Sequence, residues 1–68
     1  MEPESAVGHN LLGAIEYRNR NTEKAMAHYN EALAIKPDYQ SALKNRGLAY
    51  LGDGKFEEAA ADFRLLLD

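Results

Sequence analysis

The sequence contains no cysteine and no tryptophan, and histidine occurs only twice in its 68 residues. Without cysteine the chain can form neither a disulfide nor a thiolate metal site, which also removes one reason to propose secretion. His9 and His28 fall on different predicted helices and are too few for a structural zinc site. We therefore expect no metal site and no cofactor, and surface or packing roles for both histidines.

Long apolar runs and an excess of positive charge are also missing. No strictly apolar run exceeds four residues, whereas a membrane-spanning helix needs about 20. The first residues, Met-Glu-Pro-Glu-Ser, lack the apolar stretch of a signal peptide. The net charge is −3 and the pI about 5.3, unlike the basic balance of a nucleic-acid-binding protein. These absences predict a cytoplasmic protein that binds neither membranes nor nucleic acids.

A tandem repeat is the strongest feature that the sequence does contain. When the chain is aligned with itself at an offset of 34 residues, six positions are identical, where about two are expected by chance. The identical pairs are Pro3 and Pro37, Gly13 and Gly47, Glu23 and Glu57, Ala25 and Ala59, Ala27 and Ala61, and Leu33 and Leu67. Residues 4–37 and 38–68 are therefore predicted to be two repeats of one domain that covers residues 1–68.

Each repeat has the apolar periodicity of two helices. The first helix is predicted to begin after Ser5, whose hydroxyl can cap it. Two further helices are predicted at about 22–35 and 39–51, and the apolar residues Phe56, Ala59, Ala60, Phe63, Leu66 and Leu67 mark a last helix. No segment alternates with the period of a strand, so the fold class is predicted to be all-α, with two antiparallel helix–turn–helix hairpins.

Turn residues separate the predicted helices. Asn19 or Asn21 can adopt the left-handed conformation that ends a helix. Pro37 is expected to stop the second helix and Asp38 to cap the third. The Gly52–Gly54 segment supplies the last turn.

Two glycines in the predicted first helices have a packing explanation. Gly13 and Gly47 each cost about 1 kcal/mol relative to alanine in a helix interior. A close helix crossing would compensate for this cost. We expect Ala25 and Ala59 to face these glycines, while the aromatic residue four positions later fills the wider space.

These features resemble the tetratricopeptide repeat family. Its 34-residue unit has Leu-Gly and Tyr in the first helix, and Ala, an aromatic residue, Ala and Pro in the second. The matching residues are Leu12, Gly13, Ala25, Tyr29, Ala32 and Pro37 in the first repeat, and Gly47, Tyr50, Ala59 and Phe63 in the second. The sequence departs from the pattern at Glu16, where Tyr is usual, at Arg46, where Leu is usual, and at Leu66, where Ala is usual. The resemblance implies a right-handed α-solenoid and a non-enzymatic role in binding proteins.

The resemblance also implies that the first helices line a concave groove for a protein or peptide partner. The candidate groove residues are Asn10, Tyr17, Arg18, Lys44, Asn45 and Leu48. The predicted first helices have a net charge of +2, Arg46 included, and the second helices one of −4. Such a groove suits an acidic peptide or a C-terminal carboxylate. The alternative is that these charges are solvated surface groups without a ligand.

One segment resembles the carboxylate-clamp subgroup of the family, which grips the acidic C-terminal tails of heat-shock chaperones. Asn45 stands where that subgroup has an Asn that contacts the terminal carboxylate. The preceding first helix of the subgroup supplies a Lys and an Asn, and Asn10 and Ala14 stand there instead. Half of the clamp is therefore missing from this sequence.

Catalysis has no support in the sequence. Gly52–Lys55 contains a Gly-Lys pair without the spacing of a phosphate-binding loop. No serine has a His partner that would make a nucleophile–base pair. We predict no catalytic residues and no enzymatic activity.

The predicted last helix suggests an alternative function. No amphipathic helix follows Leu67 in this sequence to cover Phe63, Leu66 and Leu67. An uncovered apolar patch favours association. The alternative is therefore a structural module that forms a homodimer, or that stacks with further repeats in a longer array.

Overall fold

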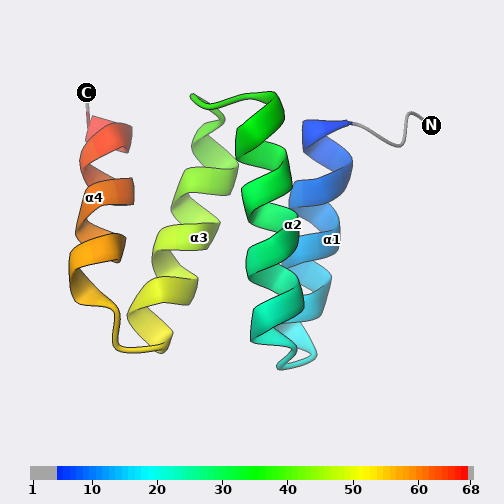
Figure 1. Cartoon of the computed structure of the whole chain (residues 1–68), viewed down its shortest axis with the longest axis horizontal. Coiled ribbons are helices and arrows are strands. Elements are labelled where there is room, and N and C mark those ends of the chain that lie inside the picture. The colour runs from blue at the N-terminus through cyan, green and yellow to red at the C-terminus, as the bar shows by residue number, and fades with distance from the viewer. Residues whose placement is uncertain (1–4, 68) are drawn as a thin grey trace.

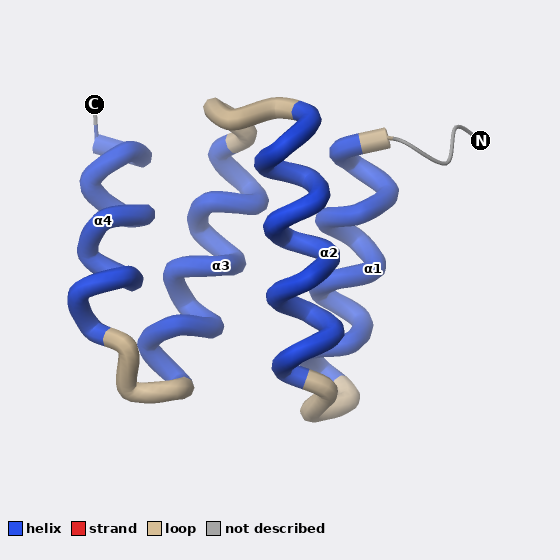
Figure 2. The backbone as a smooth tube through the Cα atoms, viewed as in Figure 1, coloured by secondary structure: helices blue, strands red, loops and turns tan. Residues whose placement is uncertain are grey.

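The computed structural model describes residues 5–67, and these form four helices joined by short loops (Figure 1, Figure 2). Their bounds are α1 Ala6–Arg18, α2 Thr22–Ile35, α3 Gln40–Gly52 and α4 Phe56–Leu67. The predicted all-α fold is confirmed, and each predicted helix boundary lies within one residue of the observed one. Pro3, Glu4 and Asp68, which entered the predicted repeats, lie outside the described residues.

The helices form two antiparallel hairpins, α1–α2 and α3–α4, joined by contacts between α2 and α3. The first helices α1 and α3 also contact each other, whereas within residues 5–67 the second helices α2 and α4 do not. The array is flat, with extents of 34 × 28 × 13 Å. Because α1 and α3 approach each other more closely than α2 and α4 do, the array is bent towards the side of the first helices.

The helix ends confirm one predicted cap and correct two other predictions. Ser5 caps α1, since its Oγ accepts a hydrogen bond from the Gly8 amide at 3.2 Å. The left-handed residue after α1 is Arg20, with φ 66°, and neither of the predicted asparagines. The N-cap of α3 is Tyr39 rather than Asp38. The exposed Asp38 carboxylate instead lies 3.4 Å from the ammonium of Lys36.

Two apolar clusters make the core. The first, which links the hairpins, consists of Ala32, Leu33, Ala42 and Leu43, with Leu66 packed against it. The second consists of Ala25, Tyr29 and Ala49, with Met26 beside it. Both clusters draw on α2 and α3, so the packing of these two helices fixes how one hairpin lies on the other.

The atoms closest to the mid-helix glycines belong to aromatic rings and not to the expected alanines. A Cβ added to Gly13 would lie 2.5 Å from the Tyr29 ring, and one added to Gly47 would lie 2.7 Å from the Phe63 ring. The expectation that Ala25 and Ala59 provide the close contact was therefore wrong. Each hairpin is held by an aromatic ring pressed against a helix backbone.

Candidate functional site

Asn10 and Asn45, two of the predicted groove residues, meet where α1 contacts α3. The Asn45 Nδ2 donates a hydrogen bond of 3.0 Å to the Asn10 Oδ1. Asn10 is only 7% exposed, an unusual location for an amide unless it is hydrogen-bonded. Together with Tyr17, Arg18, Lys44 and Leu48 these residues are called the first-helix face below.

Tyr17 reaches from the last turn of α1 to the end of α3. A Cβ added to Gly52 would lie 2.8 Å from the Tyr17 hydroxyl. Leu48, one turn before Gly52 on α3, is 45% exposed. The first-helix face therefore combines a partly buried amide pair with an exposed tyrosine and an exposed leucine.

The positive charge of the first-helix face comes from Arg18 and Lys44. Both side chains are exposed, and neither enters an ion pair among the described residues. Arg46, which contributed to the expected charge of the first helices, instead forms an ion pair with Asp62 on α4. Without it, the first helices retain a net charge of +1, since Glu16 offsets one of the two cations.

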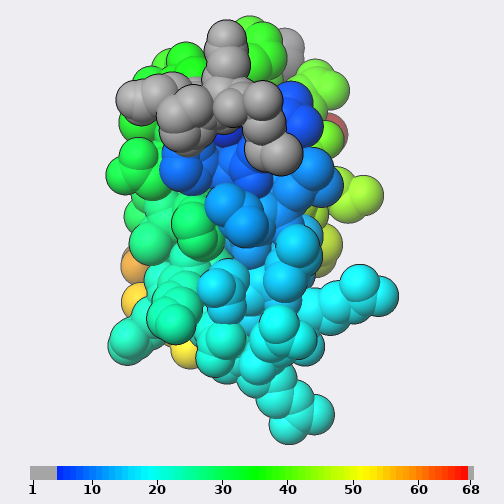
Figure 3. All heavy atoms as spheres, turned by 90° about the vertical axis from the view of Figure 1, so that its right-hand side faces the viewer, coloured from blue at the N-terminus to red at the C-terminus, as the bar shows by residue number. Residues whose placement is uncertain are grey.

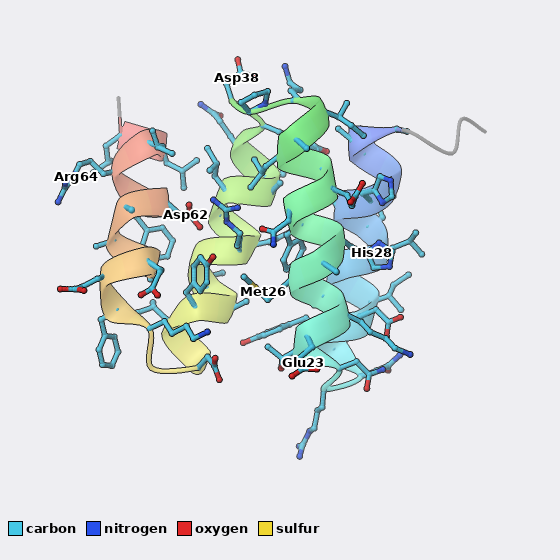
Figure 4. All side chains as sticks on the ribbon, viewed as in Figure 1. Glu23, Met26, His28, Asp38, Asp62 and Arg64 are labelled. Carbon is cyan, nitrogen blue, oxygen red and sulfur yellow. The ribbon has the colours of Figure 1, made fainter. Side chains whose placement is uncertain are left out.

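Arg46 lies at the centre of a polar network that joins three helices. Its Nε and Nη2 donate to the two Asp62 carboxylate oxygens on α4 at 2.8 and 2.7 Å, and its Nη1 donates to the Asn30 Oδ1 on α2 at 2.9 Å. Asp62 is 2% exposed and projects from α4 towards α3 (Figure 4). The Asp62 carboxylate raises the pKa of the Arg46 guanidinium, although burial acts in the opposite direction. The bidentate ion pair thus lies within the second hairpin, and the hydrogen bond to Asn30 connects it to the first.

The Arg46–Asp62 pair could not be derived from repeat periodicity. Arg46 was noticed only as a departure from a Leu position and as one of the charges of the first helices. Asp62 aligns with His28 of the first repeat, so no repeated polar pattern marked it. The only available signal was that a charge at an apolar position requires a partner.

The two histidines come together, although nothing in their spacing indicated it. The Nδ1 atoms of His9 on α1 and His28 on α2 lie 3.4 Å apart, and both side chains are half-buried. Figure 3 shows this end of the molecule, where blue α1 and green α2 form one continuous surface. The pair lies on a different part of the molecule from the Arg46 network.

The residues predicted for self-association have three different environments. Phe63 is half-buried against Gly47, and Leu66 packs on the core cluster between the hairpins. Leu67 is 87% exposed, and Leu65, which was not among the predicted residues, is also exposed. The exposed apolar side chains of α4 therefore include Phe56 as well as Leu65 and Leu67.

Two of the hollows on the surface lie near residues discussed above. One of about 510 Å³ runs along α1 and is lined by Leu11, Ala14, Ile15, Tyr17 and Arg18, so two members of the first-helix face border it. Another of about 520 Å³ opens between α2 and the α3–α4 turn, and its lining includes Glu23, Met26, Tyr50 and Asp53. None of the helices in the described part of the chain combines the length and apolar character needed to cross a membrane.

Known proteins with similar sequences share the repeat. A family model described as TPR repeat matches residues 13–54. Hsp70-Hsp90 organizing protein 1 of Glycine max is 38% identical over 50 residues, which cover 74% of this chain and 9% of that protein. The protein of the same name from Arabidopsis thaliana is 37% identical over 51 residues, 75% of this chain and 9% of that protein. Protein FlbA of Caulobacter vibrioides is 35% identical over 60 residues, 88% of this chain and 10% of that protein. The chain thus spans about a tenth of the length of these relatives, and the match of the family model over more than half of its residues shows that it belongs to the tetratricopeptide repeat family.

Proposed function

We propose that this chain is a non-enzymatic module that binds an acidic peptide or protein segment through its first-helix face. Repeats of this family mediate protein–protein interactions. The observation that carries the proposal is the amide pair of Asn10 and Asn45 at the contact of α1 and α3, with unpaired Lys44 beside it. A ligand across both helices would meet hydrogen-bonding groups at the centre and cationic groups at the edge.

Asn45 retains hydrogen-bonding capacity for such a ligand. A side-chain amide has two N–H donors, and one of those on Asn45 is used by Asn10. The second can donate to a carboxylate, while the Lys44 ammonium attracts it electrostatically. The names of two relatives connect them with Hsp70 and Hsp90, which supports a protein as the partner. The Lys and Asn that complete a carboxylate clamp are still missing, so we expect weak binding of an isolated tail.

The test is fluorescence polarisation with a labelled acidic peptide that has a free C-terminal carboxylate. We expect Lys44→Glu to weaken binding by about tenfold, which corresponds to roughly 1.4 kcal/mol. Lys24→Glu is the matched control, because Lys24 is exposed on α2 and the substitution changes the charge by the same amount. Equal affinity of the two variants would contradict the proposal. An amidated peptide that binds as well as the free acid would remove the role of the C-terminal carboxylate.

Assembly through α4 is the second candidate function, and the exposure of Leu65 and Leu67 favours it. Exposed apolar side chains of a helix can pack against another chain. Sedimentation velocity over a range of protein concentrations tests this, with Leu67→Lys as the variant. A wild type that remains monomeric at the highest concentration would exclude self-assembly.

A further inference from the structure

The contact of His9 with His28 is a precise side-chain arrangement at which the helices α1 and α2 meet. Their ring centres are 5.6 Å apart and the ring planes are inclined by 30°, so the imidazoles are not stacked. Their Nδ1 atoms are the atoms that approach each other, at 3.4 Å. Figure 4 shows His28 on the side of α2 that faces away from α3 and α4.

The protonation of the two facing nitrogens decides whether their contact is favourable. A neutral imidazole carries a proton on one nitrogen and a lone pair on the other. Two lone pairs at 3.4 Å would repel each other, and so would two N–H groups. When one Nδ1 carries its proton and the other presents its lone pair, the two rings form a single N–H···N hydrogen bond, and a cation bound to both lone pairs would take the place of that proton.

The separation matches the geometry of a tetrahedral metal site. With zinc–nitrogen bonds of about 2.05 Å and a tetrahedral angle, two ligand nitrogens lie about 3.3–3.4 Å apart. A ring centre lies about 1.2 Å behind its nitrogen, so the two ring centres of such a site would be about 5.3 Å apart. The observed nitrogen separation of 3.4 Å agrees with this geometry, and the observed ring-centre separation of 5.6 Å is about 0.3 Å longer. The nitrogens of two adjacent ligands of a square-planar metal would be closer to each other, at about 2.9 Å.

We propose that His9 and His28 bind a divalent transition metal of tetrahedral preference, with zinc as the best match, through their Nδ1 atoms. The ion would join α1 to α2 within the first hairpin. Within residues 5–67 no group of three or more His, Cys, Asp or Glu side chains gathers, so the protein supplies two ligands. Water or a donor atom from a binding partner completes the coordination.

The second repeat shows that the fold does not require this pair. Leu43 and Asp62 occupy the positions equivalent to His9 and His28. Leu43 is part of the core and Asp62 binds Arg46. The two histidines are therefore a property of the first hairpin, and metal binding there is independent of the proposed peptide binding.

The test is titration of the full chain with zinc chloride in competition with a chromophoric zinc chelator. We expect one zinc ion per chain, and binding at least about tenfold weaker in His9→Gln and His28→Gln. Imidazole ¹⁵N spectra of the wild type should report coordination at Nδ1, and zinc should raise the melting temperature of the wild type only.

A control variant combines His28→Gln with Glu58→His, which restores the number of imidazoles on the distant helix α4 without restoring the pair. Circular dichroism without metal establishes that each variant is folded. Zinc affinities within about twofold for the wild type and the folded His28→Gln variant would overturn the proposal. Recovery of wild-type affinity by the control variant would do so as well.

Discussion

Arg46→Leu replaces an unusual residue of the second repeat with the one that the tetratricopeptide pattern prefers, and that Leu12 supplies in the first repeat. Substitutions towards a family pattern commonly add about 0.5–2 kcal/mol of stability. The structure predicts that Arg46→Leu lowers the stability instead. Both carboxylate oxygens of Asp62 accept hydrogen bonds from Arg46, and the Asp62 residue is only 2% exposed.

We expect Arg46→Leu to lower the free energy of unfolding by about 3 kcal/mol. Removing one partner of a buried ion pair costs roughly 3–5 kcal/mol, because the remaining charge is left without compensation. We take the lower end, since the Arg46 side chain is itself 21% exposed and its departure would admit water to Asp62. A chain of 68 residues has a total stability of about 3–10 kcal/mol. The substitution therefore removes about 30% or more of the free energy of unfolding.

Urea denaturation followed by circular dichroism at the helix band measures this loss. For a protein of this size the free energy falls by about 1 kcal/mol per molar urea, so the midpoint should fall by about 3 M or the variant should be largely unfolded. Arg64→Leu is the matched control, because Arg64 is exposed on α4 and points outwards (Figure 4). Adding Asp62→Leu to Arg46→Leu should recover most of the stability, since it removes the unpaired carboxylate.

An Arg46→Leu variant as stable as the wild type, or as stable as Arg64→Leu, would refute this reasoning. It would mean that the buried carboxylate of Asp62 finds another partner or reaches solvent without cost.

Two further predictions concern the aromatic rings of the second helices. Gly47→Ala should lower the stability by about 1–3 kcal/mol through crowding, since its Cβ would lie 2.7 Å from the Phe63 ring. Gly8→Ala should raise the stability by up to about 1 kcal/mol, because its Cβ would meet only ordinary contacts from 3.6 Å. Similar urea midpoints for both variants would contradict this. Burial, with a smaller effect of a neighbouring tyrosine, raises the pKa of Tyr29 above its ordinary value of 10.0. The folded protein thus holds the phenolic proton more tightly than the unfolded chain, and the associated stability is complete below pH 10.0 and is lost as the pH rises through the raised pKa. Tyr29→Phe should therefore lose less stability than the wild type above pH 10.0, and equal slopes of melting temperature against pH would show the reasoning to be wrong.

The hairpins could be predicted because their signals are local. Apolar periodicity and the repeat offset placed all four helices, and Ser5 caps α1 as expected. The residues that form the turns and caps were harder to predict from the sequence. Arg20 rather than an asparagine takes the left-handed conformation, since the hydrogen bonds that close a turn can impose a strained conformation on a residue of low preference. Asp38 loses the capping position to Tyr39 because the residue at which α3 begins depends on how α3 packs against α2.

The sequence by itself determined an all-α chain of two repeated hairpins, because a 34-residue period and helical spacing can be read from the order of residues along the chain. Only the tertiary structure decided which polar side chains meet: Asn10 with Asn45, Arg46 with Asp62, and His9 with His28. These partners lie 35, 16 and 19 positions apart on different helices. Their contacts depend on how each helix is rotated about its axis, which is set by the packing of α2 against α3 and of the aromatic rings against Gly13 and Gly47. That rotation directs Arg46, which was counted in the expected charge of the first helices, towards Asp62 and Asn30, and it brings the Nδ1 atoms of the two histidines within 3.4 Å of each other.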